Sequence, residues 1–450
     1  MKYENYYLIG IGGSGMSAIA RYFKQKGADV SGYDSTPQPM TRALISEGIP
    51  VHYEPDIESI PKDTARTLII YTPAIPEKMP ELAYVKSSGY KVLKRSQVLG
   101  ELTVDQTCFG VAGSHGKTTT TTLVAHILKE SGTDCSAFIG GVSRNYGTNM
   151  LIGKDPAVVV EADEFDRSFL QLHPDFAAIT SMDPEHLDIY GTYGKMCDGF
   201  RDFASQVKDT LIVRKGLPVR QENTPARLFT YHLDDPAADF HATNLRKCGD
   251  GHYMYDLVYP AGVLEDIKVG VIGTINVDNS IAAAAICLCH GVDAQKVRRA
   301  IGTFMGAQHR LEMHLNTPHL TFFDDYGHHP KELDAAISTV RDAFPDRKIT
   351  ALFQPHTYTR TRDMHLEFAQ VLSKADDVIL LDLFPAREEP IPGVDSDLIF
   401  KDITVPKALV MKCDMLEYLK TAPLDILITL GCGDISRYAD QITEVLKGRL

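Results

Sequence analysis

Short apolar runs alternate with stretches of helical periodicity along most of the chain, which is the pattern of α/β domains. Near the N-terminus, the apolar run at residues 6–9 predicts a strand, a glycine turn follows, and residues 16–26 predict a helix. Residues 29–34 predict a second strand, and weaker strand signals stand at residues 67–71 and 92–93. The succession of strand, glycine turn, helix and strand predicts a nucleotide-binding unit.

Two more α/β blocks follow. The second opens with a strand at residues 108–112. Near-continuous apolar runs, typical of parallel strands covered on both faces, stand at residues 157–160, 176–179 and 211–213. The polar stretch at residues 220–267 is expected to add antiparallel strands, if any. In the third block, strands are expected at residues 321–323, 350–353, 378–381 and 426–430.

A chain of 450 residues is too long for one ordinary core and suggests several domains. The block boundaries fall near residues 99–107 and at Gly306-Ala307. The predicted domains are therefore residues 1–100, 101–307 and 308–450.

Composition and charge narrow the class of protein. Hydrophobic residues make up 44% and charged residues 23% of the chain, so disorder is not expected. The formal net charge of −13 argues against nonspecific binding of nucleic acid. Eight cysteines without metal-finger spacing are expected to be reduced core residues. Without a signal-like segment or a membrane-spanning run, a cytoplasmic protein with no membrane insertion is expected, as a monomer or a homodimer.

A glycine-rich loop leads from the strand at residues 108–112 into a helix-forming stretch. The loop and the residue after it are Gly113, Ser114, His115, Gly116, Lys117, Thr118 and Thr119. In such loops backbone N–H groups wrap phosphates, the lysine reaches the terminal phosphates and the threonine hydroxyl can bind Mg²⁺. The loop departs from the common motif because Val111 stands where the first glycine is expected. A variant phosphate loop is favoured over a purely structural turn.

Acidic and polar clusters follow the next two strands of the second block. Glu161 comes first after the strand at residues 157–160 and is the best candidate for a Mg²⁺ ligand, with Asp163, Glu164 and Asp166 behind it or facing solvent. His186, after the strand at residues 176–179, is a candidate ligand for a second metal ion, although a lone histidine more often has a structural role.

Two strand ends of the third block carry further candidates. Asp324 and His328 lie between a strand and a predicted helix, either as a substrate site or as ordinary helix capping before Pro330. Arg360 and Arg362 follow the strand at residues 350–353, and their guanidinium groups suit a carboxylate or a phosphate.

The glycine turn after the first strand matches a dinucleotide fingerprint. Its residues are Gly10, Gly12, Gly13, Ser14, Gly15 and Met16. Asp34 follows at about the spacing of 20 residues that a ribose contact requires, although a solvated carboxylate is the simpler alternative. A nucleotide diphosphate or a dinucleotide is expected at this turn.

With these motifs in this order, the chain resembles the Mur ligases, ATP-dependent amide-forming enzymes of peptidoglycan precursor synthesis, over essentially its whole length. Family members share the variant phosphate loop. The resemblance implies three domains: a Rossmann-like domain for the UDP-sugar, a central P-loop ATPase domain, and a Rossmann-like C-terminal domain for the amino acid. Among the family, the motifs are most similar to those of enzymes that join L-alanine to UDP-N-acetylmuramate.

The resemblance also implies roles for individual residues. The first glycine turn would receive the UDP moiety, and Lys117 would contact the terminal phosphates of ATP. Thr118 and Glu161 would bind Mg²⁺, and His186 a second Mg²⁺. Further ATP contacts carried over from the family are Asn276, Asn279, Arg310 and Asp324. His328 and Arg360 would bind the amino acid, with His328 as a candidate general base. Departures from the family pattern stand at Thr357 and in Gln308-His309-Arg310.

The expected reaction begins with phosphorylation of the lactyl carboxylate by ATP, and alanine then attacks the acyl phosphate. One alternative is the family's recycling ligase, which attaches a tripeptide to the same UDP-sugar. Outside the family, the first glycine turn and Asp34 suggest an NAD-dependent oxidoreductase, and the phosphate loop suggests a noncatalytic nucleotide-gated switch.

Overall fold

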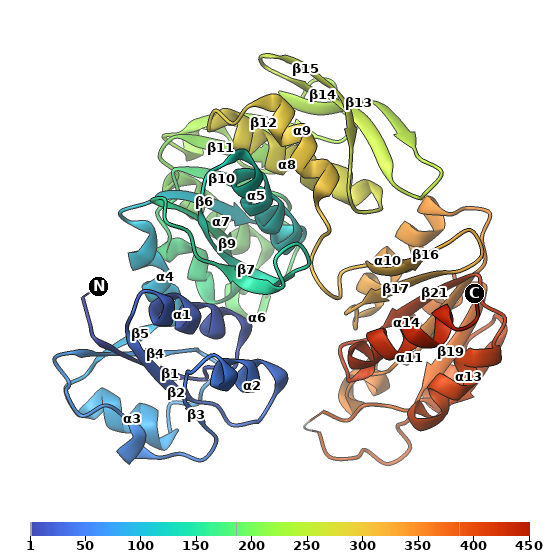
Figure 1. Ribbon diagram of the computed structural model, residues 1–450, viewed down its shortest axis with the longest axis horizontal. Coiled ribbons are helices and arrows are strands. Elements are labelled where there is room, and N and C mark those ends of the chain that lie inside the picture. Colours follow the sequence, from blue (N-terminus) through green and yellow to red (C-terminus); the bar gives the residue numbers. More distant parts are fainter. Residues whose placement is uncertain (1, 186, 387) are drawn as a thin grey trace. The chain divides into compact units, whose positions relative to one another are not determined.

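The computed structural model describes residues 2–185, 187–386 and 388–450. The chain forms two compact units. The first unit comprises Met1–Leu245, Tyr255–Val269 and Ile275–Met305, and the second comprises Arg246–Met254, Gly270–Thr274 and Gly306–Leu450. The strands form sheets of five, ten and six strands (Figure 1).

The five-stranded sheet has the strand order β3-β2-β1-β4-β5 and is parallel throughout. Its strands are β1 (Asn5–Ile9), β2 (Asp29–Tyr33), β3 (Val51–His52), β4 (Thr67–Tyr71) and β5 (Lys91–Lys94). Its helices are α1 (Ser14–Gln25), α2 (Pro39–Ser46), α3 (Pro80–Ser87), α4 (Arg95–Thr103) and the short 3-10 helix η1 (Ile57–Ser59). The strand order reverses between β1 and β4, and ligands of open α/β sheets bind beside such a reversal. The glycine turn after β1 lies there.

The ten-stranded sheet has the order β15-β14-β13-β12-β11-β10-β6-β9-β7-β8. Its strands are β6 (Thr107–Ala112), β7 (Ser136–Ser143), β8 (Thr148–Leu151), β9 (Ala157–Ala162), β10 (Phe176–Ile179), β11 (Thr210–Arg214), β12 (Arg227–His232), β13 (Phe240–Lys247), β14 (Tyr253–Tyr259) and β15 (Gly262–Lys268). Its helices are α5 (Lys117–Ser131), α6 (Leu187–Tyr190), α7 (Tyr193–Ser205), α8 (Thr274–Cys289), α9 (Ala294–Thr303), η2 (Phe165–Gln171) and η3 (Gln221–Asn223). Val158, Val159 and Val160 in β9 are fully buried, as expected for a strand covered on both faces.

The structure adds two details to the expectations for this sheet. The polar stretch after β11 begins with parallel pairing, of β12 with β11 and of β13 with β12. The strand that carries Glu161 does not stop at Val160 but continues to Ala162, so Glu161 is part of β9. Glu161 therefore has its backbone fixed by the parallel pairing of β9 with β6.

The six-stranded sheet has the order β16-β17-β21-β18-β19-β20. Its strands are β16 (Glu312–Asn316), β17 (Thr321–Asp325), β18 (Ile349–Phe353), β19 (Asp377–Leu381), β20 (Lys407–Val410) and β21 (Ile426–Leu430). Its helices are α10 (Pro330–Ala343), α11 (Tyr358–Leu372), α12 (Asp397–Phe400), α13 (Met415–Thr421), α14 (Ala439–Lys447), η4 (Lys412–Asp414) and η5 (Ile435–Tyr438). Neighbouring residues of β17 alternate between two cores, with Phe323 packed in one and Phe322 in the other.

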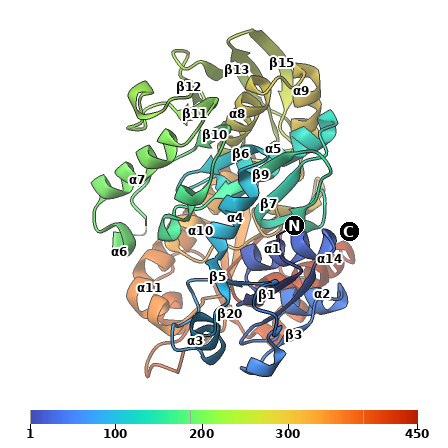
Figure 2. The same cartoon turned by 90° about the vertical axis from the view of Figure 1, so that its left-hand side faces the viewer.

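The stretch expected to separate the first two blocks is largely helical. Helix α4 leads from β5 into β6 (Figure 2) and ends at Thr103. A Cβ atom on Gly100 would lie 2.2 Å from the backbone oxygen of Gln171 in η2, so the two helices touch closely at this glycine. The five-stranded sheet and most of the ten-stranded sheet accordingly belong to one compact unit.

The second unit takes in a hairpin tip from the ten-stranded sheet. Lys247 Nζ lies 2.6 Å from Asp342 Oδ1 of α10. Gly251 lies so close to Phe344 that a Cβ atom there would be 2.4 Å from the ring. Both contacts are between residues of the second unit. This unit is therefore assembled from separate stretches of the chain.

Two expectations from composition can be compared with the structure. All eight cysteines are free; four are buried, three are partly buried and Cys413 is exposed, so the prediction of core residues is right for half of them. None of the described helices has the length and apolarity that a bilayer crossing requires.

Candidate active site

The phosphate loop lies between β6 and α5, as expected. Gly113 and Gly116 have φ angles of 143° and 80°, which favour glycine. A Cβ atom on Gly113 would be 2.1 Å from Thr180 Oγ1, so a side chain there would displace the neighbouring strand end. Ser181 Oγ accepts a hydrogen bond from the backbone N–H of His115 at 2.7 Å. The polar residues after β10 thus hold the loop in shape.

Lys117 begins α5 and points back into the loop. Its Nζ lies 2.7 Å from Glu164 Oε2 and 2.6 Å from the backbone oxygen of Gly113. The Glu164 side chain is fully buried, and that of Lys117 is 15% exposed. The contacts with Glu164 and with the Gly113 oxygen fix the place of the ammonium group beside the loop. Glu164 therefore supports Lys117, a role that the sequence left open between a supporting and a solvent-facing group.

Thr118 and Glu161 come together as the sequence predicted. Thr118 Oγ1 donates a hydrogen bond of 3.1 Å to Glu161 Oε1, and the N–H of Gly140 donates one of 2.9 Å to Glu161 Oε2. Burial raises the pKa of Glu161, against the lowering influence of Lys117 and of these hydrogen bonds. Neighbouring ligands of an octahedral Mg²⁺ ion stand about 3 Å apart, given bonds of about 2.1 Å. The spacing of the two oxygens fits this ion.

The second predicted metal ligand, His186, lies outside the described residues. Beside it in sequence, Asp183 and Glu185 approach His115 of the phosphate loop, with His115 Nε2 at 3.5 Å and 3.6 Å from their carboxylate oxygens. The polar segment after β10 thus reaches the loop, while the role of His186 stays a prediction.

Helix α8 brings two of the predicted ATP contacts, Asn276 and Asn279, to the same loop. Asn279 Nδ2 donates a hydrogen bond of 3.3 Å to Asn276 Oδ1. Thr120 Oγ1 donates one of 3.4 Å to Asn279 Oδ1. A Cβ atom on Gly116 would lie 2.5 Å from that same Asn279 oxygen. Residues far apart in sequence therefore meet around the start of α5.

The first glycine turn is held by Asp34. The N–H of Gly12 donates a hydrogen bond of 2.8 Å to Asp34 Oδ2, and the N–H of Thr36 donates one of 3.2 Å to Asp34 Oδ1. Asp34 is 8% exposed, so the solvated alternative is excluded. Met16 is buried in the core, and only its backbone can serve a ligand. Ser14 Oγ donates a hydrogen bond of 3.1 Å to the backbone oxygen of Gly140, which joins the turn to β7.

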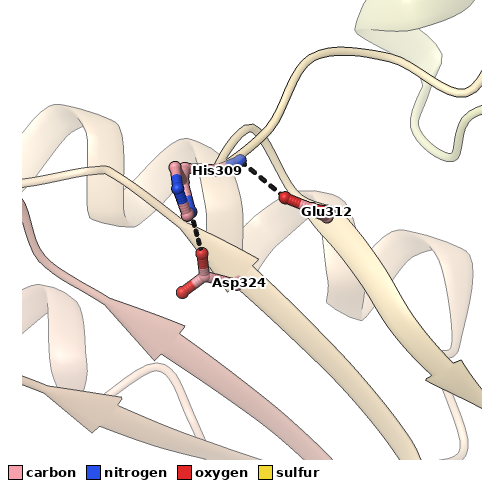
Figure 3. Close-up of side chains that lie close together, drawn as sticks. All are labelled: His309, Glu312 and Asp324. Atoms are coloured by element: carbon pink, nitrogen blue, oxygen red, sulfur yellow. Dashed lines mark hydrogen bonds and ion pairs between the residues drawn. The ribbon is translucent and has the colours of Figure 1, made fainter. Parts of the chain in front are cut away.

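In the second unit, the segment that carries Arg310 is fixed to the edge of the sheet. His309 Nδ1 lies 2.5 Å from Asp324 Oδ2, and the N–H of His309 donates a hydrogen bond of 2.9 Å to Glu312 Oε2 (Figure 3). Nitrogen and oxygen atoms of these three side chains lie within 4.8 Å of one another, the spacing of a cation site. Asp324 pairs with the imidazole of His309 and Glu312 accepts from its backbone N–H, so the cluster is better described as a hydrogen-bonded support for the backbone beside Arg310.

We expect the pKa of His309 to lie above 6.5, because Asp324 stabilises its charged form despite partial burial. A raised histidine pKa stabilises the folded state below the unfolded-state value, and this stabilisation is lost as the pH rises through the folded-state pKa. Asp324→Asn should lower the pKa of His309, measured by an NMR titration of the imidazole. The control is Asp334→Asn, which removes the carboxylate on α10 that pairs with Lys374. An unchanged pKa in Asp324→Asn would contradict the pairing.

The amino-acid candidates gather at the carboxyl edge of the third sheet. The rings of His328 and His356 have centroids 6.5 Å apart, and Arg360 Nη1 lies 3.4 Å from His356 Nδ1. Burial and the Arg360 charge lower the pKa of His356. Arg360 lies in the first turn of α11. Arg362 on the same helix pairs with Asp363 and does not join this group.

Helix capping before α10 is real but falls on His329, which is the N-cap residue, with Pro330 following at the first helical position. His328 is left beside the substrate candidates, its Nδ1 3.2 Å from the backbone oxygen of Tyr326. The capping alternative is therefore confirmed for His329, and the substrate role of His328 stays a prediction.

Two site residues escaped the sequence-based prediction. Arg95, the first residue of α4, lies outside every motif, and no spacing signal connects it with the acids after β9. Thr180, at the end of the strand at residues 176–179, stood only in a broad polar cluster, although its hydroxyl donates to the His115 oxygen at 2.6 Å. The folded structure places Arg95 beside Asp163 and Thr180 beside the phosphate loop.

Three family models match the chain in sequence order. The "Mur ligase family, catalytic domain" matches residues 5–107, the "Mur ligase middle domain" residues 111–287, and the "Mur ligase, glutamate ligase domain" residues 309–433. Together they span most of the chain.

Close relatives align over nearly the full length. A UDP-N-acetylmuramate–L-alanine ligase of Porphyromonas gingivalis is 48% identical over 450 residues, covering 98% of both chains. The enzyme of the same name from Phocaeicola vulgatus is 44% identical over 452 residues, again with 98% of each chain covered.

Solved structures share the fold. The UDP-N-acetylmuramate-alanine ligase of Thermotoga maritima has a TM-score of 0.81 at 24% identity, covering 99% of this chain and 100% of its own. A murein peptide ligase of Psychrobacter arcticus has a TM-score of 0.68 at 20% identity, with 98% of both chains covered. The predicted α/β fold of a Mur ligase is thus confirmed, and the family models and relatives lead to one conclusion: the chain belongs to the Mur ligase family.

Proposed function

We propose that this protein joins L-alanine to the lactyl carboxylate of UDP-N-acetylmuramate in peptidoglycan precursor synthesis, with ATP converted to ADP and phosphate. The observation that carries the proposal is the phosphate loop with Thr118 facing Glu161. It is supported by relatives that are 44–48% identical, align over 98% of their length and are named UDP-N-acetylmuramate–L-alanine ligase.

The first step transfers the γ-phosphoryl group of ATP to the carboxylate. A carboxylate oxygen forms a bond to the γ-phosphorus, the bond from that phosphorus to the bridging oxygen breaks, and ADP leaves with the electron pair. Lys117 stabilises the charge that develops on the phosphoryl oxygens, because its ammonium group is already held beside the loop. Thr118 and Glu161 would hold Mg²⁺, which would neutralise phosphate charge. The nucleotide base would lie near Asn276 and Asn279.

The second step forms the amide. The amino group of alanine attacks the acyl carbon of the acyl phosphate, phosphate leaves, and the surplus proton of the amine passes to a base. Arg360 would bind the carboxylate of the amino acid, and His328 is the candidate base. Arg310 and Asp324 are proposed to contact ATP, and His186 a second Mg²⁺. The domain limits 1–100, 101–307 and 308–450, the cytoplasmic location, and a monomeric or homodimeric state stay predictions.

The alternatives are not favoured. The recycling reaction is represented by a structure that is 20% identical and shows the fold alone, whereas the closely related full-length chains are named as L-alanine ligases. Membership of the Mur ligase family leaves no place for the NAD-dependent oxidoreductase or the noncatalytic switch.

We expect phosphate release from ATP to require UDP-N-acetylmuramate and L-alanine together. Colorimetric phosphate release, run separately with L-alanine, glycine, L-serine and the tripeptide, measures this requirement, and mass spectrometry of the product identifies the new amide. The kcat/KM for L-alanine should exceed the values for glycine and L-serine by roughly 10- to 200-fold, the range that small differences in pocket contacts produce. Turnover with the tripeptide as acceptor, but with none of the three amino acids, would overturn the proposal in favour of the recycling ligase.

A further inference from the structure

The first unit contains a cavity of about 240 Å³ between the first glycine turn and the acidic end of β9. Its lining residues come from α1, α4, β7 and the end of β9 and are Ser14, Gly15, Ala18, Ile19, Arg95, Leu99, Phe138, Ile139, Gly140, Glu161 and Asp163. The turn proposed to receive UDP and the proposed Mg²⁺ ligand Glu161 thus line the same cavity.

Arg95 projects into this cavity from the start of α4. A Cβ atom on Gly15 would lie 2.7 Å from Arg95 Nη1, so the guanidinium group lies directly over the glycine turn. On its other side, Arg95 Nη2 is 3.7 Å from Asp163 Oδ2. This separation is too long for a hydrogen bond, and the side chain keeps 23% of its surface exposed. The guanidinium group is therefore aligned but retains donors for a ligand.

The charges of the cavity require such a cation. Glu161 and Asp163 both present carboxylates, which repel an incoming carboxylate. Among the described residues that line the cavity, Arg95 is the only one with a cationic side chain. A planar guanidinium group binds a carboxylate through two parallel hydrogen bonds, which fixes its orientation as well as its position.

Resting on the proposed function, we infer that Arg95 is a positioning residue that holds the lactyl carboxylate of the sugar acid between the UDP-binding turn and Glu161. The apolar side chains of Ile19, Leu99 and Phe138 provide a surface for the methyl group of the lactyl arm and the acetamido group. With two carboxylate lone pairs bound to the guanidinium group, the lone pairs on the far side of the oxygens are left for attack on the phosphorus. Asp163 keeps the guanidinium group in place until the substrate arrives.

The test compares two nucleotide sugars that differ in the lactyl acid. For Arg95→Ala, we expect the KM for UDP-N-acetylmuramate to rise by about 10- to 100-fold, as for loss of a charge-assisted hydrogen bond. The Kd for UDP-N-acetylglucosamine, which lacks the lactyl acid, should change by less than about twofold. The KM for ATP should stay unchanged. Added guanidinium ion should restore part of the activity, and Arg95→Lys, which keeps the charge without the fork, should fall between Arg95→Ala and the wild type.

Arg201→Ala is the matched control, because it removes an ion-paired arginine, bound to Asp198 on α7, that does not line the cavity. Thermal melting of each variant checks folding, and Arg95→Lys carries the test if Arg95→Ala unfolds. Equal loss of affinity for both nucleotide sugars would overturn the inference and assign Arg95 to the diphosphate. Unchanged kinetics would overturn it as well. Failure of the proposed function is distinguishable, since the wild-type protein would then show no turnover with UDP-N-acetylmuramate and L-alanine.

Discussion

Lys117→Met is expected to lower turnover by about 10³-fold or more, because the phosphoryl oxygens lose the cation that is held ready beside the phosphate loop. The affinity for UDP-N-acetylmuramate should be unchanged, since we propose that a different set of residues binds the UDP-sugar. Single-turnover measurements of acyl phosphate formation and calorimetric titration of the UDP-sugar separate the two effects. Near-normal turnover in this variant would refute the assignment of Lys117.

The same substitution has a structural cost, which needs its own control. The substitution removes the ion-pair partner of the fully buried Glu164 side chain, and breaking a buried pair costs about 3–5 kcal/mol. The double variant Lys117→Met/Glu164→Gln removes both charges, so its melting temperature should recover most of the loss while its turnover stays low. Lys129→Ala, at the other end of α5 and paired with Asp134, should leave turnover unchanged. Recovered turnover in the double variant would show that Lys117 acts through folding alone.

Glu161→Gln is expected to lower the apparent affinity for Mg²⁺ in ATP turnover. The loss should exceed the roughly 10- to 100-fold that is typical when a residue behind the metal ligands is replaced. The amide keeps the hydrogen-bonding shape of the site but cannot supply the anionic oxygen that a hard cation prefers. A Mg²⁺ titration of phosphate release measures this effect. The control is Asp166→Asn, which changes an acid of the same segment that pairs with Lys94 instead.

The pH dependence follows from the same residue. Burial raises the pKa of Glu161, and only the ionised carboxylate binds metal, so the apparent Mg²⁺ affinity of the wild type should fall as the pH drops through this raised pKa. In Glu161→Gln that fall should disappear. An identical Mg²⁺ titration in the variant and the wild type would count against a metal role for Glu161.

The local parts of this structure were accessible from the sequence. The strand at residues 67–71 and the loop from Gly113 to Thr118 were predicted because apolar runs and glycine turns are determined by neighbouring residues. The parallel pairing of β12 and β13 was not predicted, because strand order depends on contacts between residues far apart in sequence.

Side-chain partners show the same division. Thr118 and Glu161 were paired in advance because the ends of neighbouring parallel strands meet at one edge of a sheet. Arg95 had no such signal, since it starts a helix whose position depends on close packing at Gly100.

The clustering of Arg246–Met254 with the C-terminal part of the chain limits how this protein can be divided or recombined. A polypeptide that starts at Gly306 would lack the ammonium group of Lys247 against Asp342 and would uncover the Phe344 ring where Gly251 now lies. A chimera that exchanges Gly306–Leu450 between homologues must therefore exchange the hairpin residues Arg246–Met254 as well. The two segments act as one exchangeable unit although they are separated in the sequence.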